Sequence, residues 1–170
     1  MRPQLETVSK FYQGYVKNVM DLDMFDALRQ SSRITLDLIR TIPESKGEFR
    51  YAEGKWSIKE LLAHMIDTER IMAYRALRFA RNDKTDLPGF EEKDYAPEAN
   101  AHGRTIAQLA DEMERLRATT IDMFESFTPE MLTREGTANK NLLSVLVLGY
   151  VIPGHETHHR KILIERYLKP

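Results

Sequence analysis

The chain has 170 residues, of which 42% are hydrophobic and 30% are charged, a composition typical of one compact globular domain covering residues 1–170. It contains no cysteine, which excludes disulfides, Cys-ligated metal centres and a cysteine nucleophile. The formal net charge of -1 lacks the basic excess that non-specific nucleic-acid binding needs, so we expect no nucleic-acid partner.

Apolar residues recur with helical periodicity in four stretches, and segments containing Gly, Pro or Asn separate them. The predicted helices cover 22–42, 57–81, 105–127 and 144–168. Aromatic residues at 11–15 predict a short extra helix before the first of these, and Thr128-Pro129 predicts a short one after the third. We expect a kink or a widened turn at Pro153, because proline removes one backbone donor inside the last helix.

Two of the predicted helices begin with a capping box, in which Ser57 is followed by Glu60 and Thr105 by Gln108. The apolar seam of the third helix alternates steps of three and four, the period of packed bundles. Its members are Ile106, Leu109, Met113, Leu116, Thr120, Met123 and Phe127.

The connections complete the architecture. We expect loop over 44–55, a long irregular connection over 82–103, and no strand. The sequence therefore predicts an all-α fold, a four-helix bundle with one long crossover between helices two and three. The N-terminus lacks the apolar core of a signal peptide, and the longest nearly apolar run, 142–152, is too short to span a bilayer. We expect a cytoplasmic protein with no membrane partner.

The placement of the histidines is the most informative feature for function. His155 and His159 lie four residues apart, on one side of a helix and one turn from each other. They share an apolar stripe with Leu148 and Ile152 that should face the bundle interior, and His64 lies on the corresponding stripe of the second helix. Three imidazoles together in a core can hardly find hydrogen-bond partners for all of their ring nitrogens without an ion. This trio is therefore the predicted metal site.

Other residues stay open at this stage. His158 can replace His159 as a ligand, since an i,i+3 pair is also feasible, and His102 is expected in a solvated loop. Near the histidines, Asp67, Glu69 and Glu156 either orient the rings or are exposed helix charges. Further along helix two, Tyr74, Arg75 and Arg78 either bind an anionic cofactor or lie at the surface.

Three segments together resemble the DinB/YfiT-like superfamily of metal-binding four-helix bundles. They are Gly54-Lys55-Trp56-Ser57-Ile58-Lys59-Glu60-Leu61-Leu62-Ala63-His64, Leu87-Pro88-Gly89-Phe90 and Gly154-His155-Glu156-Thr157-His158-His159. The resemblance implies an up-down-down-up bundle, often a homodimer, with a divalent metal on His64, His155 and His159. Characterised members include thiol-dependent S-transferases and a mycothiol-dependent isomerase.

Three functions follow as expectations. The first is a metal-dependent transferase that presents a small-molecule thiol to an electrophilic small-molecule substrate, with zinc or nickel as the divalent metal and a low-molecular-weight thiol as cofactor. The second is a metal-dependent hydrolase that uses an activated water. The third is a non-catalytic stress-response module whose metal is structural. No catalytic residue beyond the metal ligands is assigned from the sequence.

Overall fold

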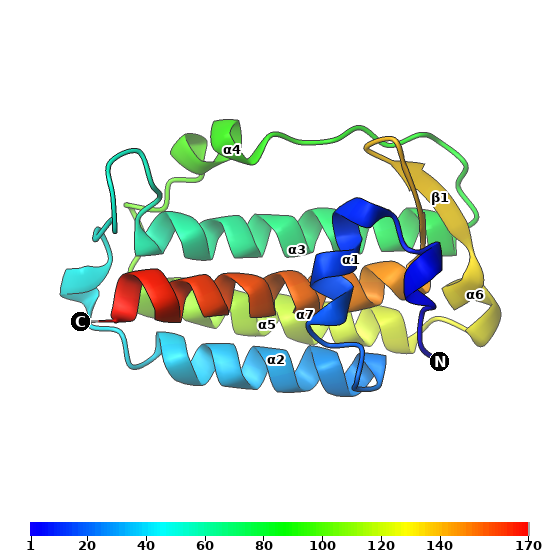
Figure 1. Ribbon diagram of the computed structural model, residues 1–170, viewed down its shortest axis with the longest axis horizontal. Helices are drawn as coiled ribbons and strands as arrows, with labels where there is room; N and C mark the ends of the chain where they lie inside the picture. The colour runs from blue at the N-terminus through cyan, green and yellow to red at the C-terminus, as the bar shows by residue number, and fades with distance from the viewer. Residues whose placement is uncertain (170) are drawn as a thin grey trace.

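The computed structural model describes residues 1–169, and four long helices form its body (Figure 1). These are α2 (Met24–Ile39), α3 (Ile58–Ala80), α5 (Ile106–Glu125) and α7 (Val145–Ile162). Helices α2 and α7 run in one direction and α3 and α5 in the other, which is the up-down-down-up order (Figure 1). Both α2 and α3 pack against α5 and α7. The predicted four-helix bundle is confirmed.

The two predicted capping boxes are present. At the start of α3, the Ser57 hydroxyl accepts a hydrogen bond from Glu60 N at 3.2 Å, and the Glu60 carboxylate accepts one from Ser57 N at 2.6 Å. At the start of α5, Thr105 and Gln108 make the same pair of bonds at 3.1 and 2.8 Å. Each box satisfies two N–H groups of a first turn that have no partner within the helix, which fixes where the helix begins.

Short helices fill the connections. They are the 3-10 turns Leu5–Thr7 and Glu44–Lys46, and the α-helices α1 (Lys10–Lys17), α4 (Glu92–Glu98) and α6 (Pro129–Thr133). The predicted extra helices before α2 and after α5 are therefore confirmed as α1 and α6. The crossover over 82–103 is less irregular than expected, because α4 lies within it. No helix among residues 1–169 combines the length and the apolar character needed to cross a bilayer.

A small β-hairpin contradicts the expectation that the chain has no strand. Strands β1 (Glu135–Ala138) and β2 (Asn141–Ser144) are antiparallel. Asn139 and Lys140 connect them with φ of 49° and 61°, the left-handed conformation that two-residue hairpin turns require. The strands have four residues each and no apolar alternation, so the periodicity of the sequence does not reveal them.

The hairpin holds the crossover in place. Leu87 N donates to the Thr137 carbonyl and the Leu87 carbonyl accepts from Asn139 N, both at 2.9 Å. This bridge ties the segment after α3 to the hairpin that precedes α7 (Figure 1). It thereby fixes the backbone of Pro88, next in the chain.

Of the kink or widened turn expected at Pro153, the widened turn is absent from α7. Helix α7 is α-helical through Pro153, and within residues 1–169 the π-helical segment covers Leu163–Leu168, after α7. Every residue from Val145 to Thr157 is buried. Packing on all sides therefore holds this stretch helical although Pro153 lacks a backbone donor.

A polar layer divides the core into two apolar clusters. One cluster lies at the hairpin end and includes Leu28, Met72, Phe124 and Leu148, and the other includes Leu36, Leu62, Leu109 and Leu163. Between them every long helix contributes buried polar side chains: Ser31 and Thr35 from α2, Thr68 and Glu69 from α3, Arg117 and Thr120 from α5, and His155, Glu156, Thr157 and His159 from α7. Of the predicted α5 seam, Leu116 and Met123 are only partly buried, and Arg117 lies deeper than both.

Candidate metal centre

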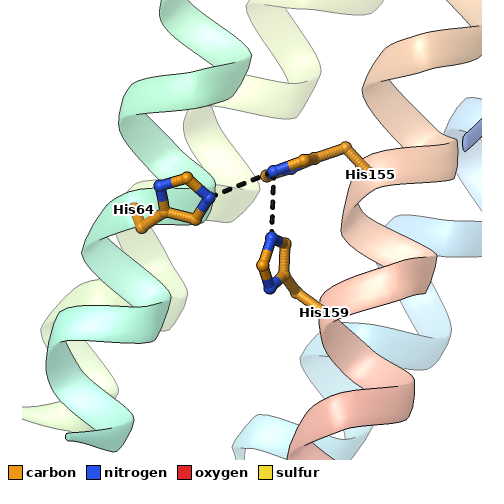
Figure 2. A group of neighbouring side chains, drawn as sticks. All are labelled: His64, His155 and His159. Atoms are coloured by element: carbon orange, nitrogen blue, oxygen red, sulfur yellow. Dashed lines mark hydrogen bonds between the residues drawn. The ribbon is translucent and has the colours of Figure 1, made fainter. Parts of the chain in front are cut away.

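The structure brings His64, His155 and His159 together. His64 comes from α3 and the other two from successive turns of α7, and the three rings point toward one another (Figure 2). The Nε2 atom of His155 lies 3.1 Å from Nε2 of His64 and 3.0 Å from Nε2 of His159. Three nitrogen donors far apart in sequence thus converge on one point between two helices.

Burial keeps these imidazoles neutral. Their exposed fractions are 8% for His64, 7% for His155 and 9% for His159. Burial lowers the pKa of His64 from 6.5 to about 4. Burial, together with the neighbouring rings, lowers the pKa of His159 to about 3 and that of His155 well below its usual value. A neutral imidazole has the free lone pair that a metal ligand needs.

Hydrogen bonding among the rings cannot satisfy the cluster. A ring nitrogen carries either one hydrogen or one lone pair in the ring plane, so His155 Nε2 cannot serve both neighbours well. The buried Nδ1 of His159 has no hydrogen-bond partner in residues 1–169, and neither has the buried Thr68 hydroxyl one turn along α3 from His64. A cation bound by the three Nε2 lone pairs resolves the conflict among these nitrogens, so the donor set fits a divalent metal with nitrogen ligands.

The other two histidines lie outside this cluster. His158 is exposed, and its ring stands edge-on to Tyr15 with 5.6 Å between ring centroids. His102 lies in the crossover loop, where its Nδ1 is 2.5 Å from a Glu48 carboxylate oxygen, and its side chain is 53% exposed. His158 therefore does not replace His159, and His102 is a surface residue as expected.

A pocket of about 190 Å³ opens in front of the three histidines. Its wall on α3 consists of His64, Thr68, Met72 and Arg75, spaced three and four residues apart. Aromatic rings close the other sides, namely Phe11, Tyr12, Tyr15, Trp56 and Phe90. Among the described lining residues Glu92 is the only carboxylic acid, and it is exposed. A metal on the three histidines would therefore keep an open position facing a small, largely aromatic chamber.

The carboxylates expected near the rings lie elsewhere. Arg117 donates to both Glu69 oxygens, at 2.9 and 2.8 Å, and also to Glu156 and to the Leu28 carbonyl. Glu69 and Glu156 are thus neither exposed nor partners of the histidines, because a buried guanidinium binds both. Asp67 is partly exposed and lies 3.6 Å from Arg70.

The sequence did not single out Arg117, although its position could have. It lies four residues after Met113 and three before Thr120, on the buried stripe of α5. All four long helices meet at its guanidinium.

The three residues further along α3 divide between surface and interior. Tyr74 is 51% exposed. Arg78 contacts both Tyr74 and Asp83 near the surface. Arg75 contradicts the surface expectation: it is 3% exposed and lines the pocket.

The fold and the site together define a class: a four-helix bundle with a three-histidine cluster able to hold a metal ion. The DinB superfamily profile matches residues 27–163, and the chain belongs to this family. No curated protein sequence matches the chain.

Solved structures share the fold at low sequence identity. YfiT from Bacillus subtilis, described as a probable metal-dependent hydrolase with an unusual four-helix bundle topology, is 13% identical with a TM-score of 0.72, over 97% of this chain and 90% of that one. A mycothiol-dependent maleylpyruvate isomerase is 11% identical with a TM-score of 0.66, over 86% of this chain and 61% of that one. The DinB-like protein YjoA from Bacillus subtilis is 19% identical with a TM-score of 0.61, over 83% and 86%.

Proposed function

We propose that the chain is a metal-dependent transferase that joins a small-molecule thiol to an electrophilic substrate, with His64, His155 and His159 as the ligands of a zinc or nickel ion. The convergence of three buried, neutral Nε2 atoms at the inner end of a pocket carries this proposal. A divalent cation bound there lowers the pKa of a thiol or water at its open position and stabilises the resulting anion.

The chain's own residues bind and enclose the reactants. Trp56 lies 4.7 Å from the His64 ring and Tyr15 lies 5.3 Å from the His155 ring, measured between centroids. These rings limit the access of water to the histidines and give an apolar surface to the body of the substrate. The sulfur nucleophile has to come from a bound molecule, because the chain contains no cysteine.

Two observations bear on the choice between a thiol and water. Hydrolases that activate a metal-bound water commonly use a nearby carboxylate as general base. Here Glu69 and Glu156 are held by Arg117, and Glu92 is the only carboxylic acid among the described lining residues, which favours the thiol. The likeness to YfiT supports the second candidate, a metal-dependent hydrolase.

Metal analysis tests the site first. We expect one divalent ion per purified chain, and its loss in each of the variants His64→Ala, His155→Ala and His159→Ala. His158→Ala and His102→Ala are matched controls that should keep the metal, because neither ring places a nitrogen among the three converging donors. Full metal retention in the His64→Ala variant would show that the ligand set is wrong.

A transfer assay tests the chemistry. We expect the metal-loaded protein to accelerate the loss of monochlorobimane only when a low-molecular-weight thiol is added. Thiol-independent cleavage of esters or amides would favour the hydrolase instead. A site that holds metal but supports neither reaction, and whose chelation unfolds the protein, would indicate a structural metal in a stress-response module.

We also propose a cytoplasmic location and a homodimeric state for the protein. A chain without cysteine suits a reducing cytoplasm, and the family resemblance implies a homodimer. Sedimentation velocity of the purified protein measures the second point directly, with a dimer expected.

A further inference from the structure

The pocket contains a second charged group besides the histidines, the guanidinium of Arg75. Its side chain is 3% exposed, and no carboxylate of residues 1–169 lies within 4.0 Å of it. Its hydrogen bonds go to neutral acceptors, from Nη2 to the Pro88 carbonyl at 2.9 Å and from Nη1 to the Met72 sulfur at 3.6 Å. Burying a charge without an opposite charge is costly, so this arrangement needs an explanation.

Arg75 is also held in a fixed orientation. The Pro88 carbonyl that accepts its hydrogen bond follows Leu87, which the β-hairpin pins through two backbone bonds of 2.9 Å. A guanidinium has five N–H donors in a planar fork, so several remain for a molecule in the pocket. The Tyr12 hydroxyl lies beside it: burial raises the pKa of Tyr12, and the charge of Arg75 opposes that rise.

The wall between Arg75 and the histidines suits an elongated ligand. His64 and Arg75 are about 16 Å apart along α3 between their Cα atoms, and the Arg75 side chain turns back toward Met72 and so shortens this span. Thr68, 3% exposed, lies between them with its hydroxyl unpaired in the described part of the chain. The volume of about 190 Å³ is below that of a drug-sized site, which limits the ligand to a small molecule.

We propose that Arg75 binds the carboxylate of a small organic acid, whose other end lies against His64, His155 and His159. This inference rests on the proposed function in one respect only, that the substrate enters this pocket. A carboxylate supplies the opposite charge that Arg75 lacks and matches its fork with two parallel hydrogen bonds. The aromatic rings of Trp56 and Phe90 pack against the organic body. The substrate class is therefore an electrophilic small organic acid.

Binding of benzoate, with benzamide as its neutral counterpart, tests this proposal without any assay of catalysis. Trp56 is the only tryptophan of the chain and lines the pocket, so its fluorescence reports occupancy, and titration calorimetry gives the affinity. We expect the metal-loaded protein to bind benzoate at least about tenfold more tightly than benzamide. Arg75→Met should remove this preference. Arg78→Met, on the same helix but paired with Asp83 outside the pocket, should preserve it.

Equal affinity for the two probes would overturn the proposal, because the pocket would then not recognise the charge. An unchanged benzoate affinity in Arg75→Met would also overturn it, because the metal alone would then hold the anion. Tighter binding of inorganic phosphate than of benzoate would also overturn the assignment to a carboxylate. If Arg75→Met does not fold, Arg75→Lys keeps the charge without the fork, and its affinity for benzoate should fall several-fold. A benzoate preference that depends on Arg75 stands even if the transferase assay fails, so the two proposals fail separately.

Discussion

The polar layer of the bundle has two sides that differ in how their buried groups are satisfied. On one side, Arg117 binds Glu69, Glu156 and the Leu28 carbonyl, so donors and acceptors largely match one another. On the other side, three imidazoles converge on one point, and no carboxylate of residues 1–169 lies within 4.0 Å of the Arg75 guanidinium. The first cluster pairs its buried charges within the chain and ties four helices together, although Glu156 Oε1 has no hydrogen-bond partner among residues 1–169. In the second, neither the shared Nε2 point nor the Arg75 charge has a counterpart among residues 1–169, which is the arrangement expected of a binding site.

The largest effect on stability is expected from breaking the Arg117 cluster. Arg117→Met leaves the carboxylates of Glu69 and Glu156 buried without a cation, and we expect a loss of about 3–5 kcal/mol in the free energy of unfolding. Urea denaturation measures it. The triple variant Arg117→Met, Glu69→Leu, Glu156→Leu removes all three charges and should recover most of the loss. A loss below about 1 kcal/mol in the single variant would mean that the cluster does not hold the helices together.

Acidification should lower the free energy of unfolding of the metal-free protein, because the buried histidines resist protonation. In the unfolded chain histidine takes up a proton below pH 6.5, whereas burial lowers the pKa of His64 to about 4 in the folded protein. The stability is therefore full above pH 6.5 and falls as the pH is lowered toward 4, by roughly 3 kcal/mol for His64 alone.

Urea denaturation in the presence of a chelator measures this dependence. The upper part of the window lies above the usual carboxylate pKa values of about 4, so histidines dominate the slope there. His64→Gln should reduce the slope of stability against pH. An unchanged slope would show that the His64 ring is already charged or solvated in the folded state.

The two sides also differ in how far the sequence predicts them. The histidine side follows from spacing, because His155 and His159 continue the apolar stripe of Leu148 and Ile152 and the capping box at Ser57 fixes the frame for His64. The capping boxes and the apolar periodicity are likewise local features of the sequence. The helix starts and the four-helix bundle that they predict are confirmed.

The burial of Arg117 is not predicted, although its place on the apolar stripe of α5 could have indicated it, and the sequence leaves Arg75 open between an anionic ligand and the surface, because most arginines in helices are exposed. Their burial depends on contacts between helices. The β-hairpin shares this property: Gly136 packs so closely on Phe79 that an added Cβ would lie 2.1 Å from the ring, a fit that no local pattern of the sequence encodes.

A smaller effect is expected where α1 covers the histidine side. Gly154 lies against the α1 backbone, and an added Cβ would come 2.1 Å from the Tyr15 carbonyl oxygen. Gly154→Ala therefore has to push α1 away from α7, and we expect a loss of about 1–3 kcal/mol in thermal or urea unfolding. Gly14→Ala is the matched control, because nothing lies within 4 Å of its Cβ, and alanine in a helix should stabilise by about 0.5–1 kcal/mol. Equal effects of the two substitutions would contradict the close approach.

The smallest effect concerns the cap that positions the histidine side. Ser57→Ala removes the acceptor for Glu60 N and should cost about 1 kcal/mol of unfolding free energy. Thr128→Ala, which removes the cap of the remote helix α6, should cost a similar amount. The two variants differ in their distance from the site. Ser57 directly follows Trp56, whose ring packs on His64, whereas Thr128 belongs to α6. If α3 frays at its start, Ser57→Ala should weaken metal binding measurably in a competition titration with a chromophoric chelator, and Thr128→Ala should not. Equal metal affinities in both variants would mean that packing around His64, and not the capping box, fixes the ring in place.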